Sequence, residues 1–228
     1  MTTIALNRQA VLGRIERAAR ESGRSASEIA LLAVSKTVTA SYIEEALRAG
    51  QTAFGESYVQ EAVKKITLLG SDALDWHFIG PIQSNKTRAI AEHFQWVHTI
   101  DRDKVAARLS AARPRGLPPL NVCIQVNVSG EASKSGVTPG SERALAEAIA
   151  GLPALRLRGL MTIPEPTEDS GLQRRRYSRL RELRDGLVRA GYALDTLSMG
   201  MSDDLEAAIA EGATIVRVGT AIFGHREI

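Results

Sequence analysis

The residues of this sequence best placed for chemistry are two cations in or beside apolar runs. Lys36 follows the run from Ile29 to Val34, and Arg217 lies inside the run TIVRVGT. If these runs are the first and last strands of a closed parallel barrel, they pair with each other. Alternation then places Lys36 on the same strand face as Val34, and Arg217 on the same face as Ile215. With both faces turned inward, the two cations flank one cavity.

Two cations in one cavity require an anion, because burying unpaired charge is unfavourable. The loops after the last two candidate strands read SMGMSDD and GTAIFG. Their small and hydroxyl residues let backbone N–H groups approach a phosphate, which barrels commonly bind at this position. We expect Ser198, Gly219 and Thr220 to contact it. A helix expected to begin at Ser202 is a poorer anion site, since two aspartates in its first turn already complement its dipole.

A lysine held near another cation loses its proton more readily and can attack a carbonyl carbon to form a Schiff base. An imine-forming Lys36 combined with a phosphate cradle points to pyridoxal 5′-phosphate (PLP) as cofactor. Arg217 at the ring nitrogen of PLP would keep that nitrogen unprotonated and so weaken the capacity of the cofactor to accept electrons. Taken singly, Lys36 is better explained as a strand-end lysine that reaches solvent, and Arg217 as a paired core arginine.

The elements that must position these residues alternate between strands and helices. Short apolar or β-branched runs predict eight strands, at 31–36, 52–57, 76–81, 96–101, 121–127, 155–163, 196–200 and 214–220. Helical patterns lie between them, such as those opened by Asp101 and Ser202 and those closed by Gly50 and Gly212. This alternation indicates parallel strands joined by helices.

Eight such units predict an α/β fold, a single (β/α)8 TIM-type barrel spanning residues 1–228. An amphipathic N-terminal helix with Val11 and Ile15 on its apolar face is expected where an eighth barrel helix would otherwise lie. An open doubly wound sheet is the alternative, and it is disfavoured because no glycine-rich dinucleotide motif follows the first strand.

Composition narrows the function classes. The 29 Lys and Arg residues against 26 Asp and Glu leave a charge of only +3, which does not indicate a nucleic-acid partner. The arginine-dense segment QRRRYSRLRELRDGL is expected to be a solvated helix face, with anion or RNA binding as the alternative. Cys123 is expected to be a buried thiol. No signal sequence or membrane span is predicted, so a cytoplasmic protein is expected. The histidines lack metal-ligand spacing, so no metal site is expected.

The chain also closely resembles the pyridoxal phosphate homeostasis protein family, small PLP-binding proteins related to the barrel domain of bacterial alanine racemase. The resemblance runs nearly end to end and is carried by LLAVSKT, FGESYVQE, WHFIGPIQSNK, HTIDR, VNVSGEASKSG, RGLMTIP, LSMGMSDDLEAAIAEG and VRVGTAIFG. It implies an alanine racemase N-terminal-domain-like barrel with Lys36 as the Schiff base. Ser198, Gly219 and Thr220 are similar to phosphate contacts, and Arg217 to the arginine that faces the ring nitrogen.

Further positions are carried over from the same motifs. Asn85 and Lys86 in IQSNK, Met161 in LMTIP and Lys134 in EASKSG resemble family positions around the mouth of the barrel. Ser57 stands where the family usually has asparagine in GENYVQE. A shorter serine there can recruit water or loosen the cofactor.

Three functions remain open at this stage. The resemblance implies a monomeric carrier with no catalytic residues, which buffers PLP or delivers it to apo-enzymes for intracellular vitamin B6 homeostasis. A PLP-dependent amino-acid racemase would need a second acid/base such as Tyr58, His77 or His225. A Schiff-base aldolase without cofactor would use the barrel and Lys36 alone.

Overall fold

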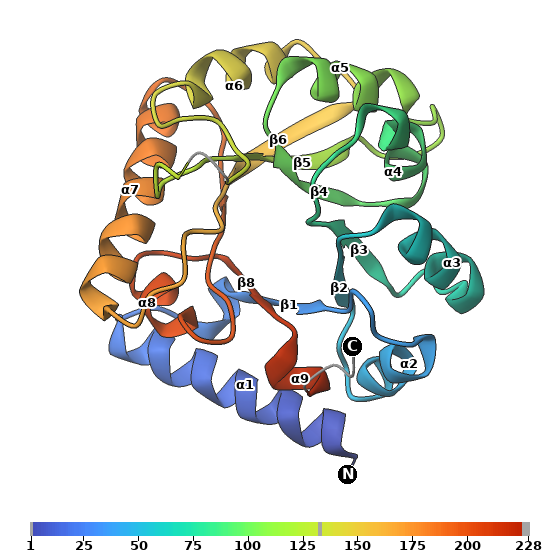
Figure 1. Cartoon of the computed structure of the whole chain (residues 1–228), viewed down its shortest axis with the longest axis vertical. Coiled ribbons are helices and arrows are strands. Elements are labelled where there is room, and N and C mark those ends of the chain that lie inside the picture. Colours follow the sequence, from blue (N-terminus) through green and yellow to red (C-terminus); the bar gives the residue numbers. More distant parts are fainter. Residues whose placement is uncertain (1, 132–133, 225–228) are drawn as a thin grey trace.

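The computed structural model describes residues 2–131 and 134–224 and contains a closed barrel of eight parallel strands in sequence order (Figure 1). The predicted (β/α)8 fold is therefore confirmed. The strands are β1 (Ala30–Val34), β2 (Ala53–Glu56), β3 (Asp75–Phe78), β4 (Trp96–Ile100), β5 (Leu120–Gln125), β6 (Leu155–Met161), β7 (Thr196–Ser198) and β8 (Ile215–Val218).

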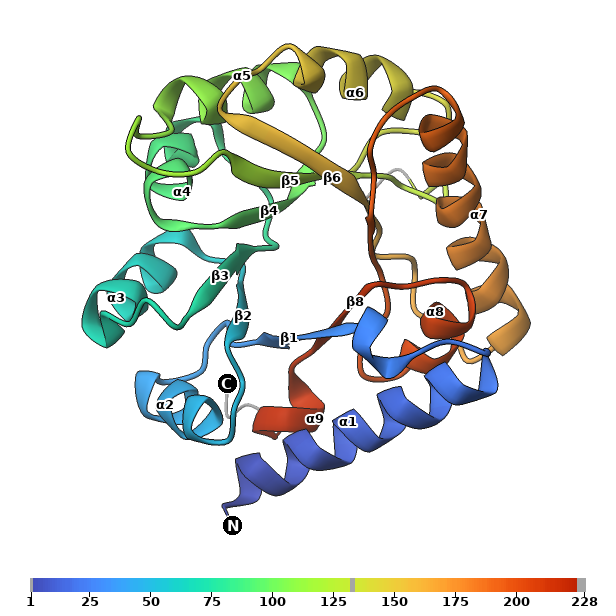
Figure 2. The same cartoon turned by 180° about the vertical axis from the view of Figure 1, so that it is seen from behind.

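Helices form a ring outside the strands, as both views along the barrel show (Figures 1 and 2). They are α1 (Thr3–Glu21), α2 (Ala40–Arg48), α3 (Val59–Leu69), α4 (Thr87–His93), α5 (Asp103–Ala112), α6 (Glu142–Ala150), α7 (Ser170–Arg189), α8 (Leu205–Ala210) and α9 (Thr220–Phe223), with 3-10 turns η1 (Ala26–Glu28) and η2 (Ser84–Lys86). α9 is a single turn after β8, and α1 packs against α8, α9 and α2. The N-terminal helix thus completes the outer ring, as the sequence indicates.

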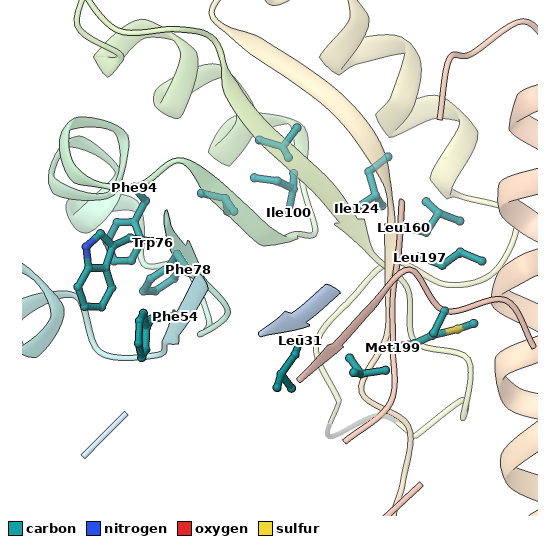
Figure 3. Close-up of a cluster of buried hydrophobic side chains, with 14 of the residues drawn as sticks. Leu31, Phe54, Trp76, Phe78, Phe94, Ile100, Ile124, Leu160, Leu197 and Met199 are labelled. Carbon is teal, nitrogen blue, oxygen red and sulfur yellow. The ribbon is translucent and has the colours of Figure 1, made fainter. Parts of the chain in front are cut away.

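The hydrophobic core lies mainly between the strands and the helices. Leu31 and Ala33 of β1 belong to this layer, whereas Val34 faces the cavity at the end of the barrel. Fully burying one large apolar side chain contributes about 1.5–3 kcal/mol, so this layer is the main source of stability. Figure 3 shows part of it, with an aromatic group on one side of the barrel that consists of Phe54, Trp76, Phe78 and Phe94.

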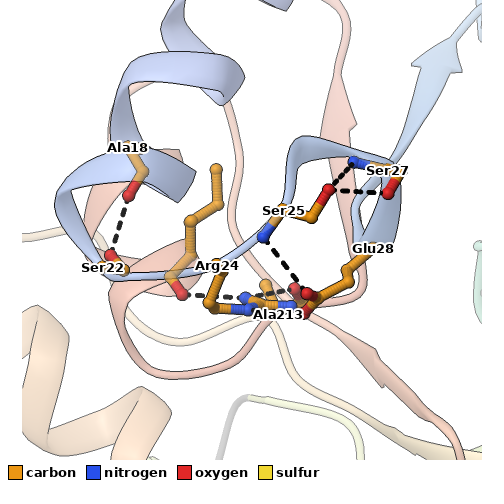
Figure 4. Close-up of polar contacts among 8 residues, drawn as sticks. Ala18, Ser22, Arg24, Ser25, Ser27, Glu28 and Ala213 are labelled. Carbon is orange, nitrogen blue, oxygen red and sulfur yellow. Dashed lines mark hydrogen bonds and ion pairs between the residues drawn. The ribbon is translucent and has the colours of Figure 1, made fainter.

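The connection from α1 to β1 fixes where the first strand enters the barrel (Figure 4). Arg24 Nη1 donates to the carbonyl oxygens of Ile209 and Ala213, each at 2.9 Å. Ser25 and Glu28 form a capping box around η1. The long helix, the start of β1 and the segment before β8 are therefore tied together on one side of the barrel.

Several elements begin or end at residues other than those expected, among them β1 and α5. β1 ends at Val34 rather than continuing through Lys36, because Thr37 has a positive φ of 62° that turns the chain out of the sheet. α5 begins at Asp103 rather than at Asp101. The Asp101 carboxylate accepts a hydrogen bond from Arg102 at 2.6 Å, and no side-chain bond caps this helix.

The remaining composition-based expectations concern single residues and one helix. Cys123 is fully buried, which confirms the expected buried thiol, and burial raises the pKa of that thiol to about 12. Tyr177 and Leu180 of α7 are buried, while Arg174 pairs with Glu211 at 2.8 Å on the outer side. No helix in the described part of the chain combines the length and hydrophobicity that a membrane span requires.

Close contact between β6 and β7 requires glycine at position 159. A Cβ at Gly159 would lie 1.8 Å from the carbonyl oxygen of Thr196, whereas one at Gly116 would have no heavy atom within 4 Å. We expect Gly159→Ala to destabilise the protein by about 3 kcal/mol or more, because two paired strands must separate. Gly116→Ala should stay within about 0.5 kcal/mol of wild type. Urea unfolding of both variants tests this, and equal midpoints would contradict the packing described here.

Candidate functional site

A cavity of about 680 Å³ lies at the carboxyl ends of the strands. Its lining includes Lys36 after β1 and Arg217 in β8, which pairs in register with Leu32 of β1. The structure therefore brings the two cations together through the β1–β8 pairing that closes the barrel. The other described residues of the lining are Arg14, Val34, Ser57, Ile79, Ile163, Met201, Ser202, Asp203, Gly219, Thr220 and Ala221.

Arg217 is held rigidly at the floor of this cavity. Its side chain donates from Nη1 to Ser198 Oγ at 2.8 Å and from Nη2 to the carbonyl oxygen of Thr162 at 2.7 Å. Only 3% of the residue is exposed, and burial lowers the pKa of the guanidinium from its ordinary value. Because both hydrogen-bond partners are neutral, its positive charge can act on a group in the cavity.

A chain of polar side chains continues behind Arg217 through the interior of the barrel. Ser198 Oγ shares a hydrogen bond with His98 Nδ1 at 2.8 Å, and His98 Nε2 shares one with His77 Nδ1 at 2.8 Å. His77 Nε2 lies 3.1 Å from Asp75 Oδ2. The pKa of His98 is well below its ordinary value, firstly because of burial and then because of His77 and Arg217. His98 is therefore a neutral support for the Ser198 hydroxyl.

Ser198 thus lies beneath the cavity and does not appear among the described lining residues. Its side chain is fully buried and contacts Arg217 and His98. Ser198 is the first residue of the stretch SMGMSDD, which the sequence predicts to approach a phosphate. Within that stretch, Met201, Ser202 and Asp203 are the described residues that line the cavity.

Asp204 shapes the loop that carries Met201 and Ser202. Its carboxylate accepts hydrogen bonds from the Met201 N–H and the Tyr177 hydroxyl, each at 2.6 Å. α8 consequently begins at Leu205, and the expectation of a helix from Ser202 is wrong. The residues expected to form its first turn instead belong to a turn that faces the cavity.

Ser57 lies where this cavity meets a second one. The second cavity, about 390 Å³, is lined by Ser57, Tyr58, Glu61, Lys86 and neighbouring residues. A Cβ at Gly80 would lie 2.2 Å from the Ser57 carbonyl oxygen, so the loop after β3 fixes the backbone of Ser57.

The other residues carried over from the family motifs lie at different depths. Lys86 lines the second cavity, while Asn85 is exposed in η2. Met161 is fully buried at the end of β6, beside Ser198 of β7. The Lys134 backbone N–H donates to the Glu131 carbonyl at 3.1 Å. Only Lys86 of these residues lines either cavity in the described ranges.

The alternative acid/base candidates are not gathered around Lys36. Tyr58 is 56% exposed and lines the second cavity. His77 is bonded to His98 and Asp75 inside the barrel. His225 lies outside the described residues. Across those residues, no cluster of three or more histidine, cysteine, aspartate or glutamate side chains could hold a metal ion.

Arg14 is a lining residue that the sequence did not reveal. It extends from α1 and forms a bidentate pair with Glu206 of α8, at 2.7 and 2.8 Å. α1 carries an apolar pattern that indicates packing against the barrel, and nothing in that pattern marks one of its arginines as a neighbour of the site.

Comparison with known proteins identifies the family. Residues 7–227 match the model of the alanine racemase N-terminal domain. The pyridoxal phosphate homeostasis protein of Pseudomonas aeruginosa is 62% identical over all of this chain and 97% of its own length. The protein of the same name in Escherichia coli K12 is 55% identical over all of this chain and 98% of its own length. The chain belongs to the pyridoxal phosphate homeostasis protein family.

Solved structures agree with this family assignment. PipY of Synechococcus elongatus, determined with PLP bound, is 36% identical with a TM-score of 0.81, over 92% of this chain and 99% of its own. A protein of unknown function from Bifidobacterium adolescentis reaches a TM-score of 0.88 at 36% identity, over 97% and 94% of the two chains. An alanine racemase from Clostridium difficile, 15% identical with a TM-score of 0.73, matches 99% of this chain over 57% of its own and shows the shared fold alone.

The neutral state of His98 predicts how stability depends on pH. On unfolding, His98 regains an ordinary pKa near 6.5, so below that pH the unfolded chain binds more protons and stability falls as pH falls. Between about pH 7.5 and about pH 5.5, the free energy of unfolding of wild type should fall by up to about 1.4 kcal/mol per pH unit more than that of His98→Gln. Urea unfolding at several pH values measures both slopes. Equal slopes would show that folding leaves the pKa of His98 unchanged.

Proposed function

We propose that this chain holds PLP as a Schiff base on Lys36 and serves PLP homeostasis, by buffering the cofactor or delivering it to apo-enzymes. The observation that carries the proposal is the shared cavity of Lys36 and Arg217 at the carboxyl ends of the barrel strands. One group supplies a nucleophilic amine, and the other a fixed positive charge.

The residues present fit PLP in size and charge. A cavity of about 680 Å³ lies within the usual range for small-molecule sites, about 300–1,000 Å³. Its described lining holds three cations and one carboxylate, Asp203. Arg14 is paired with Glu206, so Lys36 and Arg217 are the cations that suit an anionic ligand. The apolar side chains of Val34, Ile79 and Ile163 supply surface for an aromatic ring.

Lys36 would provide the covalent attachment. Its amine attacks the aldehyde carbon of PLP, and loss of one water molecule leaves a carbon–nitrogen double bond to Nζ. Arg217 would donate a hydrogen bond to the ring nitrogen while keeping its own proton. PLP acts as an electron sink most strongly when that nitrogen is protonated. Arg217 would therefore favour binding of the cofactor over catalysis with it.

The phosphate would be held by the loops after β7 and β8. Ser202, Gly219 and Thr220 all line the cavity, and the two hydroxyl groups can donate to phosphate oxygens. The backbone bonds of α9 begin with the Ile222 N–H, which donates to Gly219. The N–H groups before it can therefore face an anion. Ser198 would act indirectly, by fixing Arg217.

The comparisons support the same function. The Pseudomonas and Escherichia relatives, which this chain matches over its whole length, are named for PLP homeostasis, and PipY has been solved with PLP bound. We further infer that the protein acts as a cytoplasmic monomer without robust catalysis. The hydrogen bonds that hold His77 inside the barrel disfavour a racemase that uses His77, because such an enzyme needs a second acid/base positioned beside the substrate.

The attachment is tested with the Lys36→Ala variant. Wild-type protein mixed with PLP should become yellow from the imine absorption, and borohydride should bleach it and fix the cofactor on the peptide that contains Lys36. Lys36→Ala should lose at least about 90% of this signal, since Lys36 is the one lysine among the described residues that line the cavity. Lys104→Ala, on the outer helix α5, is the matched control and should behave as wild type. Equal labelling of wild type and Lys36→Ala would refute the assignment.

Catalysis is tested separately with the PLP-loaded protein in heavy water containing L-alanine. We expect the imine absorption without measurable exchange of the alanine α-proton above the rate of free PLP. Proton NMR of the α-position follows the exchange directly. Exchange that is at least about 100-fold faster than with free PLP, the range of a positioned acid/base, would instead establish a racemase-like enzyme.

A further inference from the structure

A buried ionic cluster lies behind Lys36, on the helix side of the sheet. Lys65 Nζ of α3 donates to Glu56 Oε1 at 2.8 Å, to Glu61 Oε1 at 2.5 Å and to the Ser35 carbonyl oxygen at 2.7 Å. The Ser35 hydroxyl also donates to Glu56 Oε1, at 2.7 Å. The side chains of Lys65 and Glu56 are 8% and 0% exposed. Lys65 of α3 and Glu56 of β2 therefore both contact the residue before Lys36, and Glu61 pairs with Lys65.

The same cluster fixes the residue after Lys36. Glu61 Oε1 accepts a hydrogen bond from the Thr37 N–H at 2.6 Å. Thr37 has a φ of 62°, a left-handed conformation that costs roughly 1–2 kcal/mol for a residue with a Cβ. It is the one non-glycine residue with a positive φ in the described chain. The bond to Glu61 compensates for this strained conformation and keeps the turn in place.

Stability alone is a poor explanation for the cluster. Buried ion pairs are often no more stabilising than apolar residues of similar volume, since desolvation opposes the attraction. Glu56 Oε2 is buried and has no hydrogen-bond partner among the described residues, which adds to the cost. Glu56 and Lys65 are also absent from the described lining of the Lys36 cavity, so the pair does not contact a ligand there.

We propose that Glu56, Lys65 and Glu61 form a positioning cluster that holds the backbone on both sides of Lys36 and so aims its amine into the cavity. The inference rests on the proposed function, because the amine matters there as the attacking group. The cluster acts on attachment of the aldehyde and not on recognition of the ring and phosphate, which contact other residues. A displacement of about 1 Å at a nucleophile is enough to reduce reaction about 100-fold.

Glu61 is the best residue for a test because its removal leaves the pair of Lys65 and Glu56 intact. In Glu61→Ala, the equilibrium constant for borohydride-trappable attachment of PLP should fall about tenfold. Affinity for pyridoxine 5′-phosphate, which has the ring and phosphate but no aldehyde, should stay within about twofold of wild type. Glu61→Gln keeps an oxygen that can accept from Thr37 and should recover attachment to within about threefold of wild type.

A second readout needs no ligand. Hydrogen exchange of the Thr37 amide, followed in a peptide that covers residues 35–40, should be at least about tenfold faster in Glu61→Ala than in wild type. Glu44→Ala is the matched control, because Glu44 lies on the neighbouring helix α2 and pairs only with Arg48 there, at 3.2 Å. Glu44→Ala should match wild type in PLP attachment, in pyridoxine 5′-phosphate affinity and in hydrogen exchange of the Thr37 amide.

The outcomes separate this inference from the proposed function. If wild-type protein does not attach PLP at Lys36, the proposed function and this inference both fail. If wild type attaches PLP and Glu61→Ala does so equally well, the inference alone is overturned. An equal loss of PLP attachment and pyridoxine 5′-phosphate affinity would also overturn it, since the cluster would then support the whole cavity.

Discussion

The pairing of β1 with β8 is the constraint on which the site depends. It closes the barrel, and its register sets Leu32 opposite Arg217. Lys36, four residues beyond Leu32, then reaches the same cavity from the adjoining strand. An open sheet of the same strands would leave these cations at opposite edges, with no common ligand.

The two cations are supported in different ways, and each support suits a different task. Arg217 is fixed through its side chain, by Ser198 and the Thr162 carbonyl, with His98 behind Ser198. Its charge and direction are thus constant. Lys36 follows the end of a strand, and contacts to Ser35 and Thr37 hold its backbone. A rigid charge with a side chain that can extend from a fixed backbone suits the proposed function, in which a reactive aldehyde is bound and also released.

The sequence predicts the barrel well because the signals for it are local. Each strand is a short apolar run. The proximity of Lys36 to Arg217 follows from closure of the barrel and from the alternation of side chains along each strand. Other details depend on tertiary contacts, which local patterns do not contain. The turn before α8 exists because Asp204 bonds to Tyr177, which lies 27 residues earlier in the chain. Ser198 points beneath the cavity because Arg217 and His98 bind its hydroxyl there.

Some interactions involve polar residues that an analysis of hydrophobic periodicity does not take into account. His77 and His98 lie on neighbouring strands, inside the motifs WHF and VHT, and their contact follows from side-chain direction once the barrel is assumed. From residue type alone, one would expect exposed positions on a helix or at a strand end for Glu56, Glu61 and Lys65. Their convergence depends on how α3 packs over β2, which only the three-dimensional structure shows.

We propose that Lys36 and Arg217 contact one ligand from two sides of the cavity. A crystal structure of the protein grown with PLP tests it most directly. The account predicts continuous electron density from Lys36 Nζ to the aldehyde carbon, with the Arg217 guanidinium within hydrogen-bonding distance of the ring nitrogen. PLP bound elsewhere, with Lys36 unmodified and its amine directed away from the cavity, would contradict it.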